Sequence, residues 1–272
     1  MNKSRDTQYH KLVKKLISTE RTELLKSVFE PLKPVEIANI LLQLKLKHQL
    51  VVLENLEREI SSEVLNNLQD SPSILGDIVK QLSPDRLSDA IEDMPQDDAA
   101  DFVGLLDDDD ADALLERLPE KDREELTYLL QYDEESAGGL MTPYVVAIRK
   151  NQTVAAAVKE IQKFIKKEGF ELFYTAYVVD EYDHLIGTIG TTELLLAERN
   201  TLIENLMNPE VVAVDQDLDQ EEVARIAKEY DLVVVPVIDK HLRLIGRVTL
   251  DDLVDVIVEE HNEDLGHIAG TG

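Results

Sequence analysis

The sequence predicts a multidomain protein, in which an all-α superhelical N-terminal domain precedes an α/β domain built from two similar motifs. Three observations support this fold class. Apolar residues recur at three-to-four spacing through residues 8–132, as is typical of helices. Within that stretch, short helical segments form a loose repeat of about twelve residues. The second half of the chain contains an internal duplication, in which β-branched runs alternate with helical patterns.

Helix breaks divide the N-terminal half into short segments. Ser83 and Pro84 are typical of an N-cap followed by proline at the first helical position, and Pro95 and Pro119 mark further breaks. A short helix cannot bury its apolar stripe alone, so repeated short helices are expected to stack into a superhelix. We place this acidic helical-repeat domain at residues 1–135.

A glycine pair and a duplication organise the rest of the chain. Gly138 and Gly139 follow an acidic run and indicate a domain boundary. The duplicated segments are Leu140-Met141-Thr142-Pro143, echoed by Leu206-Met207-Asn208-Pro209, and Leu185-Ile186-Gly187, echoed by Leu244-Ile245-Gly246. Each copy is expected to run strand, helix, strand, turn, strand, helix. In the second copy we expect a helix at about 218–230, strands at about 233–238 and 243–248, and a last helix from about 250.

The distribution of charge narrows the possible functions. The formal net charge is −28, and residues 84–135 hold twenty Asp or Glu against four Lys or Arg. Such a surface repels the phosphates of nucleic acids and attracts cations, so no nucleic-acid partner is expected. Solubility alone would explain the total charge, but it would not explain why the acids concentrate in one region.

Several kinds of chemistry lack the residues that they need. Cysteine is absent, which removes disulfides, thiolate nucleophiles and the common zinc clusters. The sequence contains no Walker A loop, no Gly-x-Ser-x-Gly and no His-Glu-x-x-His, so we expect that the protein is not an enzyme. The longest strongly apolar run, residues 232–238, is shorter than the ~18–20 residues that a membrane span requires.

The expected last helix carries an acidic stripe. At about 100° per residue, one face collects Asp251, Asp252, Asp255, Glu259 and Glu263. Like charges at i,i+4 repel by roughly 0.2–0.5 kcal/mol per pair. Asp251 and Asp252 also favour a helix N-terminus, but that explanation does not extend to the acids near the other end, which are Glu259, Glu260, Glu263 and Asp264. The stripe therefore indicates cation binding.

Asp85 and Asp89 form a second candidate pair for a cation. They lie at i,i+4 in the segment that starts at Pro84, with Glu92 and Asp93 close to the same stripe. Asp85 is explained as an acid in the first helical turn, whereas Asp89 is not.

Two other acidic segments are better explained by helix caps. Asp215, Asp217 and Asp219 imitate the start of an EF-hand, but the positions that need Gly and Glu hold Gln220 and Ile226. These acids are expected to cap a helix. The run 107–110 is interpreted as a solvated loop with a capping Asp.

Three stretches carry a resemblance to a known family. They are Tyr132–Pro143, ending Ser-Ala-Gly-Gly-Leu-Met-Thr-Pro, then Asp219–Asp231, and Val248–Leu253. In sequence and in domain order, the chain resembles the cytosolic region of MgtE-type magnesium transporters, in which an acidic helical N-domain precedes two CBS motifs. The resemblance implies CBS motifs at residues 136–202 and 203–260. It also implies that residues 261–272 begin a linker toward a membrane domain outside this sequence.

The resemblance implies a regulatory function. The chain would sense Mg²⁺ at the cytoplasmic face of the cell membrane as part of an integral membrane protein, and this part alone would be soluble. It would form a homodimer through the CBS pair and would act on its own transmembrane domain. Mg²⁺ would bridge acidic faces of the N-domain and the CBS pair and so close the pore.

The resemblance also implies a set of metal ligands. On the N-domain side these are Asp85 and Asp89, with Glu54 as a further candidate. On the CBS side they are Asp219, Glu221, Asp231, Asp252, Asp255, Glu260, Glu263 and Asp264.

A nucleotide is the alternative ligand. CBS motifs often bind adenosine nucleotides through Gly-x-x-Ser/Thr-x-x-Asp, and the second copy fits with Gly246, Thr249 and Asp252. The first copy departs from this pattern with Gly187, Gly190 and Glu193. The chain would then be an ATP- or AMP-sensing CBS module of another channel or enzyme. A third possibility is a helical-repeat scaffold that binds protein partners.

Overall fold

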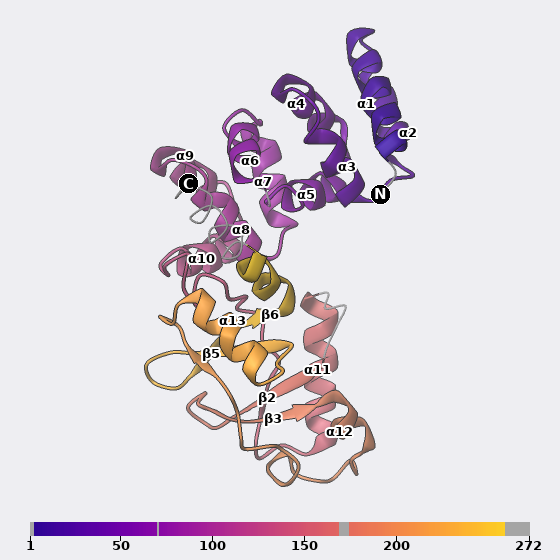
Figure 1. The fold of residues 1–272 in the computed structure, drawn as a ribbon. Helices are drawn as coiled ribbons and strands as arrows, with labels where there is room; N and C mark the ends of the chain where they lie inside the picture. Colours follow the sequence, from indigo (N-terminus) through magenta and orange to yellow (C-terminus); the bar gives the residue numbers. More distant parts are fainter. Residues whose placement is uncertain (1–2, 70, 169–173, 259–272) are drawn as a thin grey trace, which may run out of the picture. The chain divides into compact units, whose positions relative to one another are not determined.

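The computed structural model describes residues 3–69, 71–168 and 174–258, and divides the chain into two compact units (Figure 1). Unit 1 is Met1–Leu130 and unit 2 is Gln131–Gly272. Within the described ranges, no helix combines the length and the apolarity needed to cross a bilayer.

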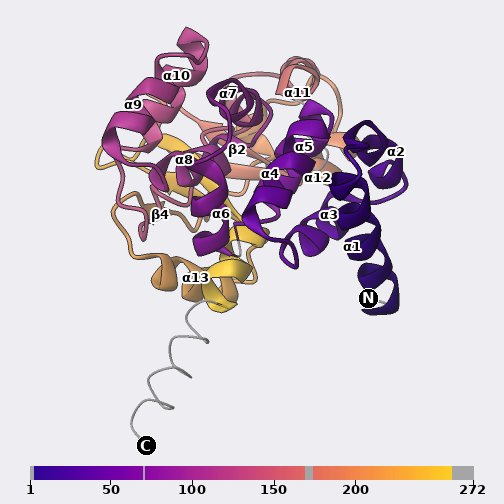
Figure 2. The same ribbon diagram turned by 90° about the horizontal axis from the view of Figure 1, so that it is seen from above.

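Unit 1 is built from helices that succeed one another along the chain, as both ribbon views show (Figures 1 and 2). They are α1 (Lys3–Ser18), η1 (Thr22–Leu24), α2 (Leu25–Phe29), α3 (Pro34–Leu41), α4 (Leu46–Asn55), α5 (Arg58–Asn66), α6 (Pro72–Val79), α7 (Pro84–Glu92), α8 (Gln96–Gly104), α9 (Asp108–Leu115) and α10 (Glu120–Leu129). The odd-numbered helices α3, α5, α7 and α9 contact one another in order, and α4 contacts α6 as α8 contacts α10. The prediction of an all-α superhelical domain is confirmed.

The twelve-residue repeat is more regular in the structure than in the sequence. Helices begin at residues 84, 96, 108 and 120, and the same spacing reaches back through 34, 46 and 58 before a longer step to 72. An apolar side chain immediately before the N-cap is buried in most repeats: Leu32, Leu44, Leu56, Leu82, Met94 and Leu118. A hydrophobic staple has an apolar residue at this position, just before the N-cap, and it fixes the angle at which the chain enters the helix.

Proline and aspartate end and restart these helices. Pro84 is the first residue of α7, and Pro95 and Pro119 are the N-caps of α8 and α10, so the predicted breaks are confirmed. Ser83 has the extended backbone of an N-cap, but its side chain makes no capping hydrogen bond. Asp107 does cap, because its carboxylate accepts from the N–H of Asp110 at 3.1 Å.

Unit 2 contains two copies of one small α/β motif. The first comprises β1 (Ala147–Arg149), α11 (Val154–Glu168), β2 (Thr175–Val179), β3 (Leu185–Gly190) and α12 (Thr191–Leu196). After η2 (Ile203–Asn205), the second comprises β4 (Val214–Asp215), α13 (Gln220–Glu229), β5 (Val234–Ile238), β6 (Leu244–Thr249) and helical residues 250–258. In each sheet the first pair of strands is parallel and the second antiparallel, with a register shift at Val178/Val179 and at Val237/Ile238. The predicted duplication and its order of elements are confirmed.

The two copies are interlocked by the segments that precede them. Thr142, ahead of the first copy, exchanges backbone hydrogen bonds of 2.9 and 3.0 Å with Arg247 in β6. Asn208, ahead of the second copy, exchanges bonds of 2.8 and 2.9 Å with Thr188 in β3. Each copy therefore completes the hairpin of the other, and the pair folds as one body.

Candidate metal and nucleotide sites

Asp85 and Asp89 both lie on α7, but each already has an arginine partner. The side chain of Asp85 is 94% exposed, and its Oδ1 lies 3.1 Å from Nη1 of Arg117. The Oδ1 of Asp89 lies 3.1 Å from Nη1 of Arg58. The further candidate Glu54 faces Arg86, with 3.6 Å between Oε2 and Nε.

Arg58 is the centre of a charge cluster that the spacing of the acids did not predict. Its Nη2 lies 2.7 Å from Glu92 and its Nε 2.7 Å from Asp93, in addition to its contact with Asp89. The pKa of this guanidinium is raised above its usual value, chiefly by the hydrogen bond to Glu92. The acids predicted as a stripe on α7 are therefore paired with Arg58 of α5. A metal ion would have to compete with this guanidinium for them.

Asp219 and Glu221 lie at the N-terminus of α13. Asp219 is the N-cap, and its carboxylate accepts from the N–H of Glu221 at 3.0 Å. The expectation of a helix cap in place of an EF-hand is thus confirmed for Asp219. Asp219 lines two open pockets, of about 550 and 340 Å³. The larger also holds Asp133, Glu135 and Asp217, and the smaller holds Glu221, Glu222, Arg225, Lys228 and Ile257.

Asp231 has a structural role that its residue type and spacing did not indicate. It follows the C-cap residue Tyr230 and has a positive φ of 52°. The N–H of Leu232 donates to the carbonyl of Ala227 at 2.8 Å, as in a Schellman motif. Asp tolerates this left-handed conformation better than most residues, and the tight turn leaves its side chain exposed.

The last helix is described as far as residue 258. Asp252 caps its start, because one carboxylate oxygen accepts from the N–H of Thr249 at 3.1 Å, and the Thr249 hydroxyl donates to Asp251 and Asp252. Asp255 is exposed one turn further on. The other acids expected on this helix, Glu259, Glu260, Glu263 and Asp264, lie outside the described residues.

The nucleotide motif of the second copy is present, but its groups are engaged within the protein. A Cβ on Gly246 would lie 2.5 Å from Sδ of Met141, so this glycine makes room for a buried methionine. Thr249 and Asp252 hydrogen bond to each other. In the first copy Glu193 accepts from the N–H of Gly190 at 2.9 Å, which reproduces the cap without a threonine hydroxyl.

No preformed metal centre links these acids. Across residues 3–69, 71–168 and 174–258, no three His, Asp or Glu side chains converge closely enough to hold an ion. The described candidate ligands of unit 2 are instead distributed over the start of α13, the turn after it and the start of the last helix.

Comparison with known proteins identifies the type of domain in unit 2 and the family of the chain. Residues 137–200 and 203–259 match the family model "CBS domain", which makes unit 2 a CBS pair. Residues 32–135 match "MgtE intracellular N domain". The solved cytosolic domain of the Mg²⁺ channel MgtE in complex with ATP is 36% identical, with a TM-score of 0.81, over 90% of this chain and 98% of that chain. The chain belongs to the MgtE family.

Other relatives agree with this assignment. The soluble part of a magnesium transporter is 28% identical with a TM-score of 0.77, over 94% of this chain and 99% of that one. The magnesium transporter MgtE of Thermus thermophilus is 38% identical over 90% of this chain and 54% of that protein. MgtE of Enterococcus faecalis is 39% identical over 54% of this chain and 32% of that protein. The chain thus spans at most about half the length of these curated relatives.

Proposed function

We propose that the chain is the cytosolic Mg²⁺-sensing regulatory region of a magnesium transporter or channel, at the cytoplasmic face of the membrane. The observation that carries this proposal is the match to an MgtE cytosolic domain through both units, at 36% identity. The acidic surface supports it, because residues 84–135 and unit 2 both carry a large excess of carboxylates. The role is regulatory, with no catalytic step.

The proposed mechanism is an electrostatic switch between the two units. Two like charges about 6 Å apart in water repel by roughly 0.7 kcal/mol, so facing acidic surfaces stay apart. Mg²⁺ takes oxygen ligands and keeps several waters, which suits it to bridge carboxylates held on separate bodies. The proposed ligands on unit 1 are Asp85 and Asp89. Those on unit 2 are Asp219, Glu221, Asp231, Asp252, Asp255, Glu260, Glu263 and Asp264. The closed form would shut the pore of the transporter's membrane domain.

A homodimer is part of the proposal. Equivalent positions of the two copies expose apolar side chains, which are Leu195 (76% exposed) in α12 and Val254 (47% exposed) in the last helix. Tyr174 and Val233, which precede β2 and β5, are also exposed. A second copy of the chain would cover both sets through one symmetric contact.

Small-angle X-ray scattering tests the switch. We expect the radius of gyration to fall in millimolar Mg²⁺ relative to chelator at matched ionic strength, and the forward scattering to report twice the chain mass of 30.7 kDa. The double variant Asp231→Asn, Asp255→Asn should raise the Mg²⁺ midpoint severalfold, since it removes two carboxylates while Asn keeps the left-handed turn.

The matched control is Glu198→Gln with Glu181→Gln, which removes two exposed charges outside the proposed ligands. If the control variant shifts the midpoint as much as the ligand variant does, the choice of ligands is wrong. Superimposable curves with and without Mg²⁺ would exclude the switch itself.

Nucleotide binding is a second candidate function, favoured by the ATP complex of the related MgtE domain. Binding at the second copy would have to replace the hydrogen bonds between Thr249 and Asp252. Calorimetric titration with ATP and with AMP, each without Mg²⁺, separates this function from ion sensing. We expect the heat of nucleotide binding to be lost in the variant Thr249→Val, because valine keeps the shape of the side chain and removes the hydroxyl. Undiminished heat in that variant would place the nucleotide elsewhere.

A further inference from the structure

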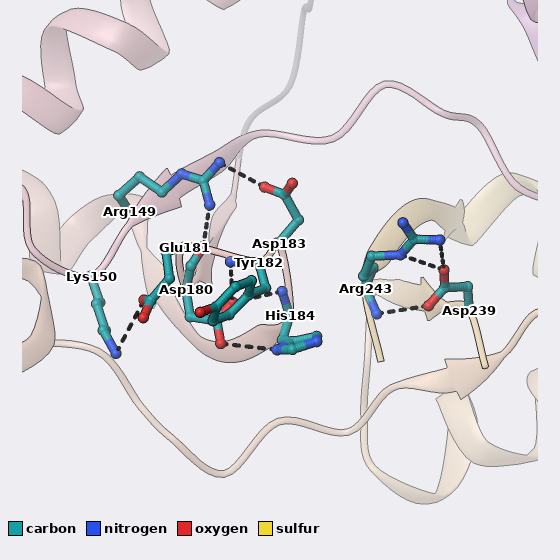
Figure 3. Close-up of polar contacts among 9 residues, drawn as sticks. All are labelled: Arg149, Lys150, Asp180, Glu181, Tyr182, Asp183, His184, Asp239 and Arg243. Carbon is teal, nitrogen blue, oxygen red and sulfur yellow. Dashed lines mark hydrogen bonds and ion pairs between the residues drawn. The ribbon is translucent and has the colours of Figure 1, made fainter. Parts of the chain in front are cut away.

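The turns that join β2 to β3 and β5 to β6 are two copies of one design. The carboxylate of Asp180 accepts from the N–H groups of Tyr182 and His184 at 2.9 and 3.0 Å (Figure 3). The carboxylate of Asp239 accepts from the corresponding N–H groups of His241 and Arg243 at 2.8 and 2.9 Å. The two turns therefore share one backbone geometry, and each has a positive φ one residue before its cation.

The two copies differ in the cation that each aspartate holds. The Nη2 of Arg243 lies 2.6 Å from Oδ2 of Asp239, whereas in the first copy the partner of Asp180 is Nδ1 of His184, at 3.0 Å (Figure 3). A guanidinium keeps its charge at every relevant pH. An imidazole is the side chain whose charge ordinarily changes between pH 5 and 8.

These turns also join the two CBS copies to each other. The N–H of Leu185 donates to the carbonyl of Leu242, and the N–H of Leu244 donates to the carbonyl of Asp183, both at 3.1 Å. His184 and Arg243 pair as an antiparallel bridge. If either turn loosened, it would therefore weaken the backbone hydrogen bonds that join the two copies at this point.

The arginine and lysine side chains around His184 are each paired with an acid. Arg149, at the end of β1, pairs with Asp183 at 2.7 Å and donates to the carbonyl of Asp180. Lys150 lies 3.9 Å from Glu181. In the opposite turn, Asp239 pairs with Arg243 and also accepts from the backbone N–H of His241. The ring of Tyr182 lies 5.8 Å from the imidazole.

Asp180 is ionised at neutral pH. Burial raises its pKa, but the hydrogen bonds from Tyr182 and His184 outweigh burial and bring the pKa below its usual value. The charge on the imidazole therefore decides whether this turn holds an ion pair or a neutral hydrogen bond.

We propose that His184 and Asp180 form a proton-controlled latch between the two CBS copies. Protonated imidazole donates a charge-assisted hydrogen bond to Asp180, and this bond is stronger than the one a neutral ring makes. The latch is tight at acidic pH and loosens as the imidazole loses its proton, while the Arg243–Asp239 turn stays closed throughout. The regulatory pair is thereby sensitive to pH, independently of whether it binds Mg²⁺.

Amide hydrogen exchange on the whole chain tests the latch at the bonds concerned. After correction for intrinsic exchange rates, protection of the Leu185 and Leu244 amides should fall about fivefold between pH 5.5 and 8.5. Equal protection at the two pH values would overturn the proposal.

Three variants sharpen the test. His184→Arg gives the first turn the arginine that the second turn has, so the protection of the Leu185 and Leu244 amides should not depend on pH in this variant. His184→Gln cannot carry a charge, so its protection should be low and equal at both pH values. Arg243→His places an imidazole against Asp239 as well, so the fall in protection of the Leu185 and Leu244 amides should be larger than in the parent. An unchanged pH dependence in either His184 variant would show that another group is responsible.

Discussion

Replacing Gly139 with alanine is expected to destabilise unit 2 by about 3 kcal/mol or more, since overpacking against a rigid neighbour has no simple relief. A Cβ at this position would collide with the carbonyl oxygen of Asp133 and would lie 2.7 Å from that of Glu134. Both are backbone atoms. The Asp133 carbonyl cannot retreat easily, because it accepts from the N–H of Ser136 at 3.0 Å and from its hydroxyl at 2.7 Å.

Two other glycines provide matched controls for this substitution. At Gly190 the nearest atom to a new Cβ is Oε2 of Glu193, at 3.6 Å, so alanine should be tolerated. At Gly76, inside α6, no atom lies within 4 Å, and alanine should stabilise unit 1 by about 0.5–1 kcal/mol. Urea unfolding followed by circular dichroism would measure all three, with one transition fitted for each unit. If unit 2 of the Gly139→Ala variant unfolded at the same urea concentration as that of the parent, the steric argument would be contradicted.

The contact between Met141 and Gly246 is expected to behave as a coupled pair. Met141→Ala should lower the free energy of unfolding by about 2–4 kcal/mol, because this fully buried side chain would leave a cavity. Gly246→Ala should lower it by about 1–3 kcal/mol, because the new Cβ would meet Sδ of Met141 at 2.5 Å and the Thr142 carbonyl at 3.0 Å. The new methyl group in the double variant lies where the sulfur was, so the combined loss should be smaller than the sum.

The duplicated pair provides a comparison within the same protein. Met207 lies over Gly187, and its Sδ would be 2.8 Å from a Cβ added to that glycine, but Met207 is only partly buried. Met207→Ala should therefore cost less than Met141→Ala. A double-mutant cycle on each pair, measured by urea unfolding, checks the coupling. Strictly additive losses at Met141 and Gly246 would show that the two residues do not share one space.

Local patterns predicted much of the fold. Pro84, Pro95 and Pro119 lie where helices α7, α8 and α10 begin, because proline suits a helix start and cannot continue one. The run Val233–Ile238 predicted β5, observed at Val234–Ile238, since β-branched residues favour a buried strand. The echo of Leu185-Ile186-Gly187 by Leu244-Ile245-Gly246 predicted that the two copies would share one order of elements.

The candidate site was less accessible to sequence reasoning. Asp85 and Asp89 were identified by type and spacing, but their partners come from about thirty residues away in the chain. Arg58 lies on α5 and Arg117 lies in the turn after α9. Helical spacing describes only neighbours within one element. Asp231 was a candidate only through the family resemblance. The sequence had one signal for its structural role, because Asp231 follows the end of a predicted helix and precedes an apolar run.

The sequence by itself determined the succession of short helices, the duplicated α/β motif and the excess of negative charge, because each depends on residues close together in the chain. Only the tertiary structure decided that Arg58 would pair with acids of the stripe on α7, that Met141 would fill the space above Gly246, and that the turn of His184 would meet the turn of Arg243. These contacts join segments far apart in sequence, and they form because burial and backbone pairing bring the segments together.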